Sequence, residues 1–169
     1  EAEDALRRVQ QRLSSLAKFH QDLYETASLA QLRADQVLED LARQTTNLGS
    51  DANRQIDLRL DMDKVTLAPD QAGPLAMLGT EALTYAVKHA SGTTDGPVFV
   101  ALSMKHAGGD TGQEISVTIE NSLSAEGGTG RDVGLGMRLI TAFATQLDGQ
   151  LRQERMGDRY VVEVVFDRV

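Results

Sequence analysis

Two short segments carry groups that could bind a charged ligand. In the first, Glu81 and Tyr85 stand four residues apart in a stretch with helical periodicity, so both lie on one face of the expected helix. In the second, Gly134 and Gly136 open a later expected helix, where free backbone amides and the helix dipole attract anions. A GxG pair also permits an ordinary tight turn into a helix, so the second pattern alone is weak evidence.

The three histidines form no catalytic or metal-binding pattern. His20 falls on an apolar helical stripe, where helix packing is the simpler explanation. His89 ends an expected helix and is either structural or close to a binding site, whereas His106 follows a strand near a glycine turn and should face solvent. Their separation provides neither a metal cluster nor the spacing of a Ser-His-Asp triad.

Composition limits the class of protein further. The 169 residues, of which 41% are hydrophobic, suffice for one compact domain and an appended element. A net charge of −8 argues against a nucleic-acid surface, and the lack of cysteine excludes disulfides and fits a reducing cytoplasm. No run of apolar residues reaches the roughly 18 residues needed to span a bilayer, so the sequence predicts no membrane insertion. The first residue is Glu1 rather than Met, as expected of a piece of a longer chain that could itself be anchored.

A seven-residue repeat runs through the first 24 residues. Apolar or pairing side chains alternate in steps of four and three, which predicts a helix that packs in a bundle or coiled coil. A single helix cannot bury such a stripe alone, so the repeat predicts a homodimer formed through this helix. The positions are Ala2, Leu6, Val9, Leu13, Leu16, His20 and Leu23.

The rest of the chain predicts a two-layer α/β sandwich, with helices on one face of a mixed, mostly antiparallel sheet. Helical periodicity predicts helices over 32–48, 70–89 and 135–147, with Asp70 and Asp132 as N-caps. Period-two alternation predicts a strand over 56–60 and two hairpins, at 98–104 with 114–120 and at 150–154 with 160–166. Glycine and small polar residues over 125–132 predict a mobile loop.

In this order and spacing, the motifs resemble those of sensor histidine kinases of the HisKA_2/HWE type. Arg12–Tyr24 is similar to the second helix of that family's dimerisation and phosphotransfer hairpin. Ala86–Ala90 and Gly134–Leu139 are similar to parts of its ATP-binding domain, which has the Bergerat or GHKL fold. The resemblance covers nearly the whole chain and divides it into a helix at 1–27 and an ATPase-like domain at 28–169.

The resemblance implies two-component signalling, with ATP and Mg²⁺ as cofactors. The family transfers the γ-phosphoryl group of ATP to a histidine and then to a response regulator receiver domain. That phosphoacceptor histidine belongs to a preceding helix outside this sequence. Glu81 is the candidate catalytic residue, because it stands at a retained polar position of the family. The candidate nucleotide-binding residues are Tyr85, Lys88, Glu120, Ser122, Gly134, Leu135 and Gly136.

Several of these positions depart from the family pattern. Tyr85 replaces an Asn amide that binds magnesium, and a phenol is a poor ligand for that cation. Glu120 replaces a shorter carboxylate that holds the adenine amino group, and Ser122 and Ser124 replace two glycines that admit the base. Lys88 could contact phosphates, although a Lys at a helix C-terminus is ordinary. These departures predict an impaired nucleotide site.

Three functions therefore remain open. The first is the catalytic core of a sensor histidine kinase with an impaired ATP site, whose ATP-dependent activity is doubtful. The second is a pseudokinase or phosphotransfer scaffold that docks a response regulator without binding ATP. The third is an anti-sigma-type protein kinase of the same fold, which the heptad helix disfavours.

Overall fold

The chain forms a five-stranded sheet covered on one face by helices. The computed structural model describes residues 3, 6, 7, 10–12, 14, 18, 31–92, 96–109, 111–125 and 134–169. The sheet order is β2-β4-β5-β7-β6; β2 runs parallel to β4, and the other neighbours are antiparallel. The strands are β2 (Asp57–Met62), β4 (Phe99–His106), β5 (Glu114–Ser122), β6 (Gln150–Met156) and β7 (Arg159–Asp167).

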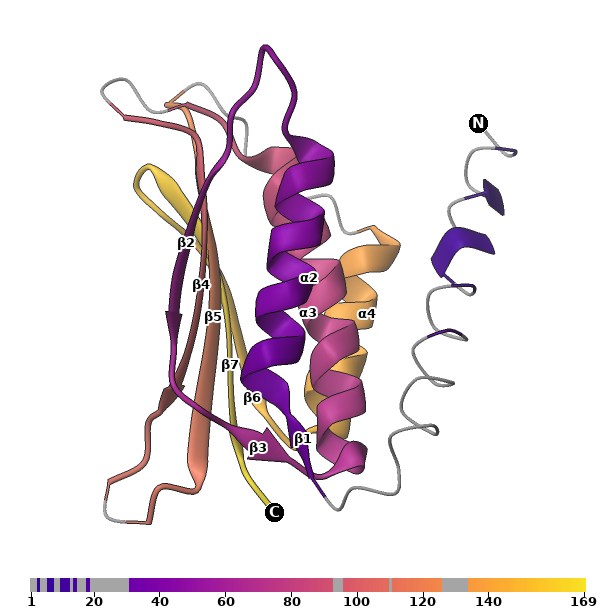
Figure 1. The fold of residues 1–169 in the computed structure, drawn as a ribbon, viewed down its shortest axis with the longest axis vertical. Coiled ribbons are helices and arrows are strands. Elements are labelled where there is room, and N and C mark those ends of the chain that lie inside the picture. Colours follow the sequence, from indigo (N-terminus) through magenta and orange to yellow (C-terminus); the bar gives the residue numbers. More distant parts are fainter. Residues whose placement is uncertain are drawn as a thin grey trace.

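Three helices pack side by side on one face of this sheet (Figure 1). They are α2 (Ala34–Gly49), α3 (Pro69–His89) and α4 (Leu135–Gln146). A two-stranded sheet of β1 (Leu32–Arg33) and β3 (Thr66–Leu67) lies at one end of the helices. The predicted two-layer sandwich and both predicted hairpins are confirmed. The opposite face of the main sheet carries no helix among the described residues (Figure 1).

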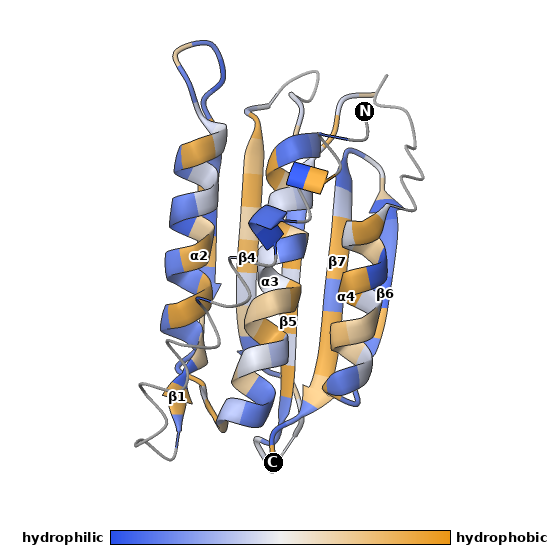
Figure 2. Ribbon diagram, turned by 90° about the vertical axis from the view of Figure 1, so that its right-hand side faces the viewer, coloured by the Kyte–Doolittle hydropathy of each residue, from blue (hydrophilic) through white to orange (hydrophobic). Residues whose placement is uncertain are grey.

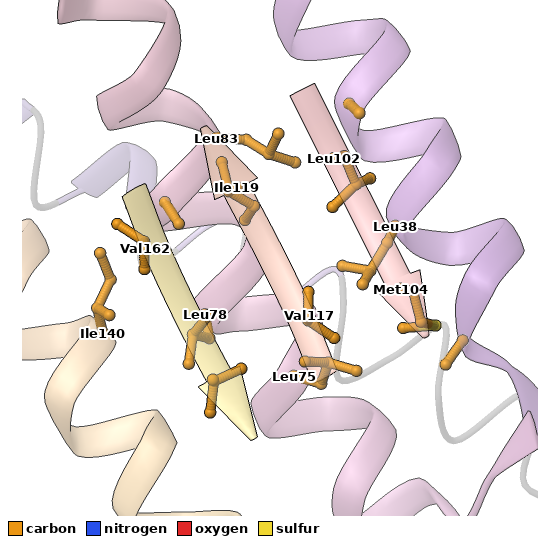
Figure 3. Packing of buried hydrophobic residues seen from close by; sticks show 14 of the residues in the cluster. Leu38, Leu75, Leu78, Leu83, Leu102, Met104, Val117, Ile119, Ile140 and Val162 are labelled. Atoms are coloured by element: carbon orange, nitrogen blue, oxygen red, sulfur yellow. The ribbon is translucent and has the colours of Figure 1, made fainter. Parts of the chain in front are cut away.

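The core lies between the sheet and the helices. Along β5, Ile115, Val117 and Ile119 are buried at every second position, as a strand with one covered face requires. Leu75, Leu78 and Leu83 of α3 pack onto this row (Figure 3). Hydrophobic residues make up much of β4, β5 and β7 behind the helices (Figure 2).

Close contact between α2 and α3 depends on glycine. A Cβ atom at Gly79 would lie 2.5 Å from Leu38 Cδ2, and one at Gly49 would lie 2.1 Å from Val87 Cγ1. Both distances are shorter than van der Waals contact, so these positions let the two helices approach. Gly49 is the last residue of α2.

Helix ends differ from the predictions in detail. The N-cap of α3 is Ala68, which provides no side-chain hydrogen bond, and Asp70 lies inside the first turn. The N-cap of α4 is Gly134, because the helix begins at Leu135; Asp132 lies outside the described residues. At the other end of α3, Arg54 Nη2 donates to the carbonyls of Val87 and Ala90, at 2.6 Å each.

Most of the predicted N-terminal helix lies outside the described residues. The residues that are described before position 19 all have helical conformation. Leu13, Leu16 and His20, on which the heptad prediction depends, are not among them, and neither are residues 126–132 of the predicted mobile loop.

Candidate functional site

Helix α3 presents Tyr85 toward the end of the sheet, where an aromatic cluster forms. The ring centroid of Tyr85 lies 4.2 Å from that of His89 on the same helix and 5.4 Å from that of Tyr160 on β7. Both contacts have tilted geometry, with interplanar angles of 38° and 45°. Burial, together with the neighbouring Tyr85 hydroxyl, raises the pKa of the Tyr160 phenol above its ordinary value. Tyr85 therefore packs as an aromatic side chain between α3 and β7.

One turn earlier on α3, the Glu81 carboxylate forms a two-pronged ion pair with Arg12. Arg12 Nε donates to Oε1 at 3.0 Å, and Arg12 Nη2 donates to Oε2 at 2.9 Å. Glu81 is 5% exposed. Since a buried carboxylate is costly without a partner, the guanidinium compensates its charge.

The first turn of α4 lies against this ion pair. A Cβ atom at Gly136 would lie 3.3 Å from Glu81 Oε2 and 3.4 Å from Arg12 Nη2. The structure thus brings Glu81, Gly136 and Arg12 together. Gly134 has extended backbone geometry as N-cap of α4, and the Leu135 side chain is exposed. Lys88 is exposed in the last turn of α3, beyond Tyr85.

The structure places Glu120 away from the other predicted site residues. Glu120 alternates with the buried Ile119 on β5, so its side chain lies on the sheet face opposite the helices. There it accepts a hydrogen bond from Arg159 Nη1 at 3.3 Å. The adjacent Asn121 has the inward parity instead, is 1% exposed and pairs in register with Tyr160. At the end of β5, the residue beside the aromatic cluster is therefore Asn121.

Ser122 and Ser124 are also engaged in ways that the sequence did not predict. The fully buried Ser122 Oγ accepts a hydrogen bond from the Phe99 amide at 2.9 Å, which ties the ends of β4 and β5. The Ser124 amide donates to Ser91 Oγ at 2.8 Å, and the Leu123 amide donates to the Asp158 carbonyl at 2.7 Å. The amides of Leu123 and Ser124 are thus already satisfied by protein acceptors.

The described residues contain no cluster of metal-ligating side chains of the usual kinds. No group of three or more His, Cys, Asp or Glu residues among them is placed to hold a metal ion. Within the same residues, no helix has the length and apolar character needed to cross a bilayer.

Sequence reasoning missed three residues of this region. Asn121 could have been found from its parity with Ile115, Val117 and Ile119, which predicts the inward face. Tyr160 is the second residue of β7, and its contact with Tyr85 depends on which strand lies beneath α3. Arg12 lies 69 positions from Glu81, and no local pattern indicates that contact.

Comparison with known proteins gives one family match and several structures of similar fold. The family model described as "HisKA_2: Histidine kinase" matches residues 1–48. A search of curated proteins found no match. Among solved structures, the histidine kinase domain of the Erythrobacter litoralis EL346 blue-light activated histidine kinase is similar over 92% of this chain and 74% of that one. Its TM-score is 0.70 and its identity 22%.

Two further structures agree. The mycobacterial sensor histidine kinase MprB is similar over 82% of this chain and 97% of that one, with a TM-score of 0.62 and 12% identity. The Acinetobacter baumannii histidine kinase AdeS is similar over 98% of this chain and 79% of that one, with a TM-score of 0.63 and 13% identity. At these identities the likeness establishes the fold, which is that of histidine-kinase ATPase-like domains.

Residues 1–48 thus match a histidine kinase family, and the described chain has the fold of histidine-kinase ATPase-like domains.

Proposed function

We propose that this chain is the catalytic-core region of a two-component sensor histidine kinase whose magnesium–ATP site is impaired. The observation that carries the proposal is the packing of Tyr85 against His89 and Tyr160. Tyr85 packs there as an aromatic ring, and its neutral phenol is a poor ligand for magnesium, which requires hard oxygen ligands in near-octahedral geometry. The residues present therefore fit a magnesium-bound triphosphate poorly, which is the basis for an impaired site.

The end of β5, where the family resemblance places the adenine base, supports the same proposal. The inward position at the end of β5 holds the neutral amide of Asn121, whose Nδ2 donates to the Ser122 carbonyl at 3.1 Å. A carboxylate there would accept a charge-assisted hydrogen bond from the adenine amino group, which is about twice as strong as a neutral one. The next amides, of Leu123 and Ser124, have protein acceptors, so they are withdrawn from any ligand.

The start of α4 keeps the physical features of an anion site. Gly134 and Gly136 flank the first helical residue, and helix N-termini bind anions through free amides and the dipole. We infer that a phosphate group could still bind there weakly. The proposal also assigns the cofactors ATP and Mg²⁺, at reduced affinity, and a homodimer formed through the N-terminal helix. A response regulator receiver domain is the proposed protein partner.

A gain-of-function test distinguishes Asn121 from Glu120 as the residue of β5 that faces the nucleotide. We expect Tyr85→Asn combined with Asn121→Asp to tighten magnesium–ATP binding at least tenfold in calorimetric titration. Tyr85→Asn combined with Glu120→Asp is the matched control and should leave the affinity near that of Tyr85→Asn alone, because residue 120 faces the opposite side. Equal affinities for the two double variants would contradict the assignment of Asn121. Circular dichroism checks that each variant is folded.

The second candidate is a scaffold that docks a receiver domain without ATP. The pairing of Glu81 with Arg12 favours it, because the candidate catalytic carboxylate is already engaged. The dissociation constant of the cognate receiver domain, measured with and without magnesium–ATP, distinguishes the two. An unchanged constant favours the scaffold, whereas a change of severalfold favours the kinase core.

A further inference from the structure

Arg12 and Glu81 join the N-terminal segment to the sandwich. The planar guanidinium meets the carboxylate through Nε and Nη2, at 3.0 and 2.9 Å, in the fork geometry that fixes orientation as well as distance. The described N-terminal residues lie on the side of α3 and α4 that faces away from the sheet (Figure 1). The contact therefore fixes where Arg12 sits on the helical layer.

Burial distinguishes this pair from an ordinary surface ion pair. The Glu81 side chain is 5% exposed and that of Arg12 is 30% exposed, whereas in the pair of Arg43 with Glu39 the side chains are 57% and 36% exposed. An exposed pair of the latter kind contributes little, because water solvates both charges. Removing one member of a buried pair leaves an uncompensated charge, which the structure then has to relieve.

Gly136 shapes the place where the guanidinium fits. Because a Cβ atom there would lie within 3.4 Å of both charged groups, glycine lets the first turn of α4 approach the pair. Glu81 and Gly136 thus form a docking notch on α3 and α4. Its chemistry suits one guanidinium: a buried carboxylate at the base and a glycine backbone at the side.

We propose that this docking notch is an interaction surface for the N-terminal helix, and that docked Arg12 withholds the Glu81 carboxylate from the nucleotide site. Undocking of the helix then frees the Glu81 carboxylate, which lies beside the first turn of α4. The inference rests on the proposed function, because it takes Glu81 as the candidate catalytic residue. The occupant is Arg12 of the same chain, as in the structure.

Distances between spin labels test the docking without any nucleotide. The chain contains no cysteine, so Gln10→Cys and Ala142→Cys place two labels at exposed positions, one on the N-terminal segment and one on α4. The labelled chain is diluted into an excess of unlabelled chain, so that only distances within one chain are measured. We expect a single narrow distance distribution by pulsed electron paramagnetic resonance.

Variants of the pair should undock the helix. Arg12→Ala and Glu81→Gln should each broaden the distribution and shift it to longer distances, and Arg12→Lys should give an intermediate result because it keeps the charge but loses the fork. Arg7→Ala is the matched control, since Arg7 is exposed on the same segment and carries the same charge. Glu81→Gln nearly preserves side-chain size, so a folded sandwich is expected, and circular dichroism checks it.

The outcomes separate this inference from the proposed function. An Arg12→Ala distribution equal to that of the unmodified chain or of Arg7→Ala would overturn the docking, whatever the affinity for ATP. A broad distribution in the unmodified diluted chain would also overturn docking within one chain. Conversely, tight magnesium–ATP binding with the expected distance changes would overturn the impaired site and leave the docking notch in place.

Discussion

The Tyr85 ring on α3 lies 5.4 Å from the Tyr160 ring on β7, measured between centroids, and this contact joins the helix to the sheet. Tyr160 belongs to the same face of the sheet as Asn121, its partner in register. Helix and sheet are thus joined by aromatic packing at the position where the family resemblance implies a magnesium ligand. Such aromatic pairs contribute about 0.5–1.5 kcal/mol beyond their area burial.

Tyr160 should ionise at a higher pH than an ordinary tyrosine, because burial and the Tyr85 hydroxyl both raise its pKa. We expect Tyr85→Phe to lower this pKa toward the ordinary value of about 10 without reaching it, since burial is the larger cause. Ultraviolet absorbance at alkaline pH follows the ionisation, with Tyr160→Phe identifying the signal. A Tyr160 titration that is unaffected by Tyr85→Phe would show that the two hydroxyls do not interact.

Asp35 should make the free energy of unfolding depend on pH in the acidic range. Arg33, and then the Val65 amide, lower the pKa of the Asp35 carboxyl, while burial opposes them. Because the folded pKa lies below the unfolded value of about 3.9, this stabilisation is present above about pH 4 and is lost as pH falls through the folded pKa. We expect Asp35→Asn to reduce the free energy of unfolding by about 1–3 kcal/mol at pH 7.

Urea unfolding across the acidic range measures this effect. The difference between the unmodified chain and Asp35→Asn should shrink as pH falls below about 4. Asp40→Asn, at an exposed position of the same helix, is the control and should show little difference at any pH. A difference for Asp35→Asn that stays constant as the pH falls to about 2 would mean that ionisation of Asp35 contributes nothing.

Gly79→Ala should destabilise the sandwich, although alanine is more favourable than glycine in a helix by about 1 kcal/mol. The added Cβ would lie 2.5 Å from Leu38 Cδ2, so α2 and α3 must separate or Leu38 must leave its rotamer. We expect a net loss of about 1–3 kcal/mol in thermal or urea unfolding. Gly109→Ala, which meets no atom within 4 Å, should cost much less. Equal losses in the two variants would contradict the tight contact of the helices.

Periodicity predicted most of the fold because it reports which face of each element is buried. It could not indicate β1 and β3, since two residues are too few for any period. The spacing of the family motif points to Glu120, whereas alternation along β5 continues the inward row of Val117 and Ile119 to Asn121. Arg12 could not be predicted, because its contact with Glu81 joins segments 69 positions apart.

The dissociation constant of magnesium–ATP for the unmodified chain distinguishes an impaired nucleotide site from an intact one. Loss of a charge-assisted contact or an unpaired buried group costs about 1–3 kcal/mol, and two or three such losses weaken binding by roughly a hundredfold or more. Isothermal titration calorimetry should therefore give heats too weak to define a constant, or one in the millimolar range. A micromolar dissociation constant would contradict the impaired site and indicate an ordinary kinase.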